Sequence, residues 1–180
     1  MNKVILSFVA LATSFSANAQ LFSTQSGEIG FFSKTPVEDI EAKSKHVLAV
    51  LHTEKLTVAF KVDNTGFEFP NKLMQEHFNE KYMESETYPN SSFTGKINEQ
   101  IDLTKEGEYD VTVSGKLLIH GVEQERTIPG KVIVKPGELV LQSDFKVKVV
   151  DHKIAIPKLV VAKIAEEISV KVNAALQPKK

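Results

Sequence analysis

Residues 109–150 read YDVTVSGKLLIHGVEQERTIPGKVIVKPGELVLQSDFKVKVV. At the start of this stretch apolar residues such as Val111 alternate with polar residues such as Asp110, which is the period of a β-strand with one buried and one solvated face. His120-Gly121 and residues 135–138 (KPGE) interrupt the alternation, and both predict hairpin turns because Gly adopts positive φ and Pro pre-sets a turn. The stretch therefore predicts a three-strand antiparallel meander, whose apolar face the rest of the chain must cover.

Five further runs in the chain are alternating or largely apolar. They predict strands at residues 27–33, 42–52, 56–62, 92–97 and 167–174. With the meander they make eight strands, enough to close into an antiparallel barrel whose interior is either filled by side chains or holds one small ligand. The sequence therefore predicts an all-β fold built as an extended eight-stranded antiparallel β-barrel.

One helix is expected, over about residues 71–83. Asn71 is a candidate N-cap, and apolar residues then recur at helical spacing, namely Leu73, Met74, Phe78 and Tyr82. The helix must therefore cover apolar surface. Two interpretations stay open, because it can plug the end of the barrel as part of the core or form a lid over a cavity.

The N-terminus has the pattern of a secretory signal peptide. A lysine at position 3 precedes an apolar run over residues 4–12, and Ala17-Asn18-Ala19 supplies a small-x-small cleavage site. The run is shorter than the roughly 20 residues that span a bilayer. We expect a signal peptide over residues 1–19, one barrel domain over 20–175, a frayed tail over 176–180, and a periplasmic or secreted protein cleaved near Ala19.

Composition narrows the possible functions. The chain has 180 residues, a formal net charge of −1, no Cys and no Trp. A near-zero charge argues against nucleic-acid binding, which requires a basic patch, and without Cys the fold depends on its hydrophobic core rather than on disulfides. The oligomeric state, monomer or homodimer, is left open.

Three sequence blocks resemble the YceI-like family, the exported polyisoprenoid-binding proteins of bacteria. The first is residues 73–95 (LMQEHFNEKYMESETYPNSSFTG), which is similar to the helix block of that family. The second and most specific is residues 113–122 (VSGKLLIHGV), which resembles the pattern G-x-L-x-I-x-G-V. The third is Ser143-Asp144-Phe145 with Asp151, Ile156 and the closing segment EISVKV.

The resemblance extends from about Gly27 to Ala174. It implies a lipocalin-like barrel whose lumen takes the isoprenoid tail of a prenyl lipid or quinone. The opening block departs from the family pattern, because many members begin with a Trp and an Asp followed by a His-Ser pair, whereas this chain reads SGEIGFFSKT over residues 26–35.

A tunnel for a long apolar chain needs many apolar side chains and few polar ones, since each buried CH₂ contributes about 0.8 kcal/mol. Strand parity and the helical stripe give the candidate ligand-binding residues. These are Phe31, Phe60, Leu73, Phe78, Met83, Phe93, Val113, Leu117, Leu141 and Phe145. The same residues would form the core of a barrel with a filled interior, so a structural or stress-related barrel that binds nothing is the alternative.

Catalytic and metal-binding signatures are absent from the sequence. The five histidines, at positions 46, 52, 77, 120 and 152, form no HxH or HExxH pattern and have no Cys partner; each is expected in a turn or on the surface. No nucleophile elbow, P-loop or dinucleotide fingerprint occurs. We therefore expect a protein that binds an apolar small molecule, with no enzyme activity, cofactor or metal, and no nucleic-acid partner.

Overall fold

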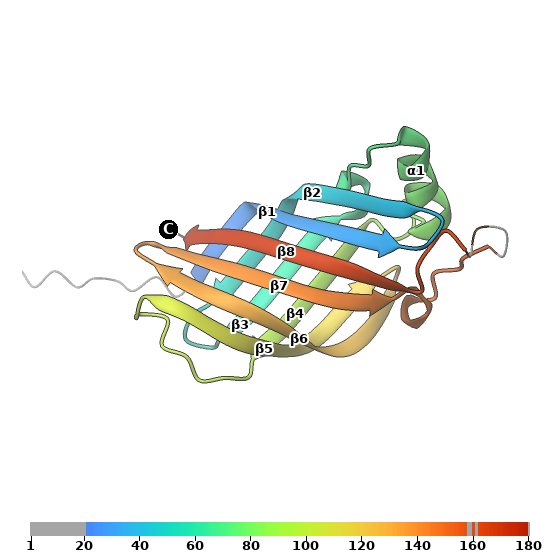
Figure 1. The fold of residues 1–180 in the computed structure, drawn as a ribbon. Coiled ribbons are helices and arrows are strands. Elements are labelled where there is room, and N and C mark those ends of the chain that lie inside the picture. The colour runs from blue at the N-terminus through green and yellow to red at the C-terminus, as the bar shows by residue number, and fades with distance from the viewer. Residues whose placement is uncertain (1–20, 158–159, 161, 180) are drawn as a thin grey trace, which may run out of the picture.

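A computed structural model describes residues 21–157, 160 and 162–179. Eight strands form a closed antiparallel barrel in which each strand is hydrogen-bonded to the next and β8 returns to β1 (Figure 1). The strands are β1 (Leu21–Lys34), β2 (Asp39–His52), β3 (Thr57–Asp63), β4 (Asn90–Ile97), β5 (Gly107–Ile119), β6 (Val122–Lys135), β7 (Glu138–Lys148) and β8 (Glu167–Pro178). The predicted eight-stranded antiparallel barrel is confirmed. The predicted signal peptide lies outside the described residues.

Two predicted hairpin turns join the strands of the meander. His120 and Gly121 connect β5 to β6 with φ of 50° and 70°, the pair of positive values that a type I′ turn needs. Pro136 and Gly137 connect β6 to β7, and Gly137 has a φ of 73°, as at the third position of a type II turn. These turns fix the register that directs the alternating apolar side chains inward.

A close backbone approach joins β4 to β5. Gly95 lies directly opposite Gly115, and the register continues through this pair without a shift. A Cβ added at Gly115 would collide with the carbonyl oxygen of Thr94. Only residues without a side chain allow the two strands to come this close.

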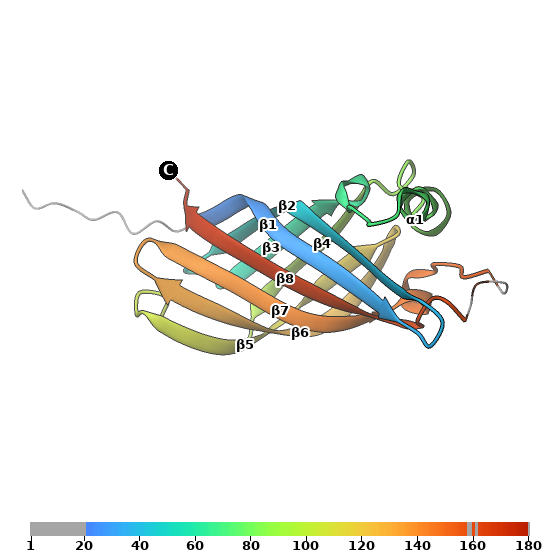
Figure 2. The ribbon, with the colours of Figure 1, turned by 45° about the horizontal axis from the view of Figure 1, so that its top comes forward.

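The predicted helix is a short α-helix followed by a π-helical turn. α1 spans Lys72–His77 and η2 continues it over Phe78–Tyr82. The side chain of Asn71 accepts hydrogen bonds from the backbone N–H groups of Leu73 and Met74, so Asn71 is the N-cap. Figures 1 and 2 show α1 beside one end of the barrel, where β1 finishes and β2 begins. We call this the open end.

At the opposite end the barrel is filled by side chains. Leu51, Ile97, Leu139 and Leu176 are almost fully buried in one apolar cluster, together with Val132. We call this the packed end. The expected frayed tail from residue 176 is wrong, because β8 continues to Pro178 and Leu176 has no exposed surface; its side chain supplies core volume that a shorter strand would lose.

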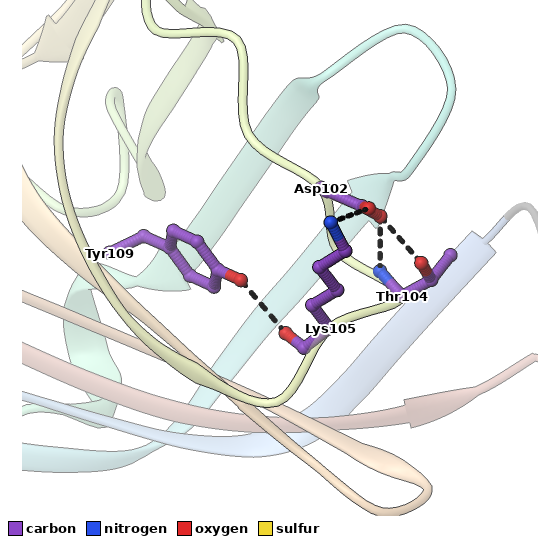
Figure 3. A network of polar contacts seen from close by, with 4 residues as sticks. All are labelled: Asp102, Thr104, Lys105 and Tyr109. Carbon is purple, nitrogen blue, oxygen red and sulfur yellow. Dashed lines mark hydrogen bonds and ion pairs between the residues drawn. The ribbon is translucent and has the colours of Figure 1, made fainter.

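The segment between β4 and β5 covers the packed end. Ile101 and Leu103 pack against its apolar cluster. The segment is held by a polar network in which Asp102 accepts hydrogen bonds from Thr104 and pairs with Lys105 at 3.6 Å, while the Tyr109 hydroxyl donates to the Lys105 carbonyl at 3.0 Å (Figure 3). The hydrogen bonds from Thr104 lower the pKa of the Asp102 carboxyl. These local bonds hold the segment over the filled end of the barrel.

Candidate functional site

The interior of the barrel contains a cavity of about 570 Å³. All ten candidate residues named from the sequence line it: Phe31, Phe60, Leu73, Phe78, Met83, Phe93, Val113, Leu117, Leu141 and Phe145. A volume of several hundred cubic ångströms is typical of a small-molecule site. The space therefore has the size and the apolar wall that a hydrocarbon ligand needs.

The wall of the cavity differs along the barrel. Toward the packed end its surface is made by buried aliphatic residues that also belong to the packed cluster, among them Val58, Ile97 and Val132. Toward the open end the lining includes Leu73, which is 56% exposed to solvent. The cavity is therefore closed by apolar packing at one end and bordered by a solvent-accessible helix at the other.

Four phenylalanines surround the cavity near the helix. Phe31 comes from β1, Phe67 and Phe69 from the segment before α1, and Phe78 from η2. Their ring centroids lie 5.1–5.8 Å apart in five ring pairs, the spacing of favourable aromatic contacts. The cluster joins the helix to the barrel and gives the cavity a smooth aromatic surface.

The helix lies against the cavity rather than in the core. No residue of α1 or η2 is buried, whereas Met74, His77 and Tyr82 all line the cavity. Partial burial raises the pKa of the Tyr82 phenol, because it removes water from the charged form. Of the two interpretations left open by the sequence, the arrangement favours a lid over a plug.

Several lining residues were missed by the sequence reasoning. Phe67 and Phe69 are not among the candidates from the sequence, although aromatic residues directly before a helical lid indicate a cavity wall. Ile128 and Val132 of β6 could have been found from strand parity. Ser33 also lines the cavity, is buried, and accepts a hydrogen bond from the Ala165 N–H at 2.9 Å. It could not have been found from the sequence, because a serine between Phe32 and Lys34 gives no sign of burial.

The buried polar groups of the cavity wall are engaged with one another. Asn64, which is fully buried, donates its side-chain amide to the Tyr88 carbonyl at 2.6 Å and accepts from the Ser91 hydroxyl at 2.8 Å. Its backbone N–H donates to the Pro89 carbonyl. These bonds fasten the segment after the helix and the start of β4 to the η1 turn (Asn64–Gly66), which follows β3. They are structural contacts and form no nucleophile–base pair of the kind that activates a hydroxyl.

Two histidines, His120 and His152, make hydrogen bonds between segments at the open end. His120 lies in its predicted turn, where its ring nitrogens contact the His152 carbonyl and the Glu84 carboxylate, each at 3.1 Å. The expectation that every histidine is at a turn or surface is wrong for His152, which is fully buried. Its Nδ1 bonds to the Val122 carbonyl at 3.0 Å, because the η3 turn (Val149–His152) folds under the β5–β6 hairpin.

Burial lowers the pKa of the His152 imidazole, so the ring is neutral at physiological pH. The Nε2 atom of this ring has no hydrogen-bond partner among the described residues. Among the residues that the structure describes, no three His, Cys, Asp or Glu side chains gather closely enough to hold a metal ion. His152 therefore acts as a packed structural residue of the turn.

Together these features define a lipocalin-like barrel with an apolar cavity, which is a class of small-molecule-binding protein. The YceI-like domain model matches residues 8–176. The chain belongs to the YceI-like family.

Solved structures share the fold at low sequence identity. A polyisoprenoid-binding domain from Saccharophagus degradans matches with a TM-score of 0.75 and 14% identity, over 90% of this chain and all of that one. Burkholderia cenocepacia BcnA matches with a TM-score of 0.70 and 17% identity, over 83% and 95%. The Campylobacter jejuni YCEI protein matches with a TM-score of 0.57 and 16% identity, over 99% and 94%.

Among curated proteins, no relative matches this sequence. In the part of the chain that the structure describes, no helix has both the length and the apolar character required to cross a lipid bilayer.

Proposed function

We propose that this protein is exported and binds a polyisoprenoid, or the isoprenoid tail of a quinone, inside its barrel. The observation that carries the proposal is the cavity of about 570 Å³ with its aliphatic and aromatic wall. A chain of isoprene units gains about 0.8 kcal/mol for each CH₂ equivalent removed from water. The same cavity argues against the alternative of a barrel filled by its own side chains.

Two further observations support the ligand class and the export. One structural neighbour is itself described as a polyisoprenoid-binding domain. The first nineteen residues combine a lysine, an apolar run and a small-x-small site, the composition of a cleaved signal peptide. Fractionation of cells with N-terminal sequencing tests the export, and we expect a periplasmic or secreted protein beginning at Gln20.

Lipid mass spectrometry tests the ligand. The protein purified from its native envelope fraction is extracted with organic solvent, and we expect a co-purifying prenyl lipid or prenyl quinone. The absence of any such lipid, together with no uptake of an added one, would contradict the proposal.

A matched pair of variants tests whether the lipid binds inside the cavity. Leu117→Trp places a large ring inside the barrel, whereas Lys116→Trp adds the same ring on the outer face of the same strand. We expect Leu117→Trp to lose the co-purifying lipid and Lys116→Trp to keep it. The chain has no other Trp, so the fluorescence of each variant also reports whether its ring lies in an apolar environment.

A further inference from the structure

The pairing between β6 and β7 stops halfway along the barrel. Five residue pairs join the two strands, from Lys135 opposite Glu138 at the hairpin to Lys131 opposite Gln142. Beyond that point residues 122–130 of β6 and 143–148 of β7 have no backbone pairing with each other, although β6 stays fully paired with β5 and β7 with β8. We call this unpaired stretch the β6–β7 seam (Figure 1).

Proline accounts for the start of the seam. Thr112, the β5 partner of Pro129, directs its N–H to Glu99 and its carbonyl to Asn98. The backbone of Thr112 thus faces away from β6, and in an antiparallel ladder the backbone of Pro129 must then face β7. Proline has no N–H to donate, so the ladder cannot continue there.

Side chains bridge the seam where backbone bonds are missing. The Ser143 hydroxyl donates to the Pro129 carbonyl at 2.6 Å, and the Arg126 guanidinium donates to the Lys146 carbonyl at 2.8 Å. Side-chain bonds open and close more readily than a continuous strand ladder, because each can break without breaking its neighbours. The seam is therefore the stretch of the β6–β7 boundary that can part without breaking backbone pairing.

The start of the seam separates the cavity from an outer groove. Pro129, Gly130, Gln142 and Ser143 line both the cavity and a groove of about 380 Å³ on the outer surface. This part of the barrel wall is therefore only one layer of residues thick. On the β7 side of the seam, Phe145 and Val147 face the cavity, whereas Asp144 and Lys146 are exposed on the outer face.

The outer groove is polar but nearly balanced in charge. Lys131 pairs with Glu108 at 2.7 Å and approaches Asp110 at 3.9 Å, and Lys171 pairs with Asp144 at 3.5 Å. Both lysines already have carboxylate partners, so the groove offers no surplus positive charge to an anionic group. An uncharged head group with hydrogen-bonding oxygens suits it better.

From these observations we propose that the β6–β7 seam is a side entrance through which an isoprenoid tail enters and leaves the cavity, while an uncharged polar head group stays in the outer groove. This inference rests on the proposed function. It narrows the ligand class of the proposed function to prenyl alcohols and quinones, whose head groups are uncharged, and excludes prenyl phosphates. Parting the seam would lengthen or break the Ser143 and Arg126 bonds and leave the adjoining ladders intact.

A reversible disulfide across the seam tests the entrance. A Cβ built at Gly130 lies 3.9 Å from the Ser143 Cβ, inside the roughly 3.5–4.5 Å range of disulfides, and the chain has no cysteine of its own. The control is the double variant Ser114→Cys with Thr127→Cys, whose native hydroxyls lie 3.0 Å apart across the continuous β5–β6 ladder. Both disulfides tie β6 to a neighbour, but only the first links the two sides of the seam, at its start beside the outer groove.

Retinol serves as the probe, because it is a fluorescent isoprenoid alcohol with an uncharged head. Its transfer from the protein to phosphatidylcholine vesicles is followed by stopped-flow fluorescence, before and after reduction of the disulfide. We expect the oxidised Gly130→Cys, Ser143→Cys protein to release retinol at least about tenfold more slowly than the same protein after reduction, since gating motions limit ligand release. The control disulfide should leave the rate unchanged.

Substitutions that weaken the seam test the entrance in the opposite direction, since they should speed release. This test does not require the disulfide variant to fold. Ser143→Ala and Arg126→Met each remove one bridging hydrogen bond and should speed release by about threefold to tenfold. Ser114→Ala, which removes a hydroxyl contact in the continuous ladder, should not. Retinoic acid, with its charged head, should bind more weakly than retinol.

The outcomes separate this inference from the proposed function. If no variant and no wild-type protein binds retinol or a longer prenyl alcohol, the proposed function fails. If all of them bind but the oxidised seam releases retinol at the reduced rate, and the loosened variants match Ser114→Ala, the side entrance is wrong and the ligand moves through the open end.

Discussion

The two ends of this barrel are built from similar apolar residues, but one end forms a filled core and the other borders the cavity. At the packed end Leu51, Leu139 and Leu176 are almost fully buried, and the side chains leave no room for a ligand. At the open end Phe31 and Phe78 are only half-buried and border the cavity. Apolar character alone therefore does not separate stability from binding in this protein; what separates them is how completely the neighbouring elements fill the space.

The sharpest test of this difference compares two leucines. Leu139→Ala at the packed end should lower the free energy of unfolding by about 2–5 kcal/mol, because a fully buried side chain leaves a cavity behind. Leu73→Ala at the open end, where the side chain is 56% exposed, should change it by less than about 0.5 kcal/mol. Chemical denaturation measures both, and equal losses would remove the distinction between the ends.

Phe145→Ala should give an intermediate loss of stability. A phenylalanine in a filled core costs about 3–5 kcal/mol when truncated. The ring of Phe145 is half-buried and borders the cavity, so in the ligand-free protein we expect a loss below about 3 kcal/mol. Thermal and chemical denaturation of the delipidated protein give the value, and a loss equal to that of Leu139→Ala would mean that the lumen is packed around this ring.

Phe78→Ala should affect binding more than folding. The ring contacts Phe31, Phe67 and Phe69, with centroid distances of 5.1–5.6 Å, and belongs to a turn without any buried residue. We expect retinol affinity to fall by about tenfold, the equivalent of about 1.4 kcal/mol, while the free energy of unfolding falls by less than about 2 kcal/mol. Retinol titration and chemical denaturation of the same preparation measure the two effects. A loss of stability without a loss of retinol affinity would mean that the phenylalanine cluster serves the fold and not the binding site.

The smallest expected effect is a pH dependence at the open end. Burial lowers the pKa of His152 in the folded state, so the unfolded chain binds more protons once the pH falls below about 6.5, the ordinary value of histidine. Stability should therefore decline as the pH falls through that value and be independent of this group above it. Asp151 and Arg126 act on the ring in opposite directions and more weakly than its burial.

Denaturation between pH 7.5 and pH 5 checks this, with His152→Gln as the test and His46→Gln, at an exposed position of β2, as the control. The loss of stability with acid should be smaller in His152→Gln than in the wild type and unchanged in His46→Gln. An unchanged pH dependence in His152→Gln would show that other groups cause it.

Much of the fold could be predicted from the sequence because its signals are local. The alternation in residues 109–119 directs Val111 and Leu117 inward whatever the partner strands are. His120-Gly121 and Pro136-Gly137 define their turns by backbone preference alone. For the same reason the ten candidate residues all line the cavity, since strand parity and helical spacing determine which face a side chain is on.

Other features depend on contacts between distant residues. The burial of His152 requires η3 to fold beneath the β5–β6 hairpin, where its ring bonds to Val122, a residue thirty positions earlier in the chain. The burial of Leu176 requires β8 to extend past its obvious alternating segment. Neither residue has a neighbourhood that distinguishes it from an exposed one, because burial is decided by what packs on a side chain and not by the residues beside it in the chain.

The strands, their turns and their inward faces can be predicted from the sequence, since these follow from the backbone preferences of adjacent residues. The filled packed end, the cavity and the parting of β6 from β7 beyond the Lys131–Gln142 pair depend instead on how distant residues pack together. Residual volume is the difference between the space the closed strands enclose and the space their combined side chains occupy. That difference is a property of all eight strands together, and no single strand carries it.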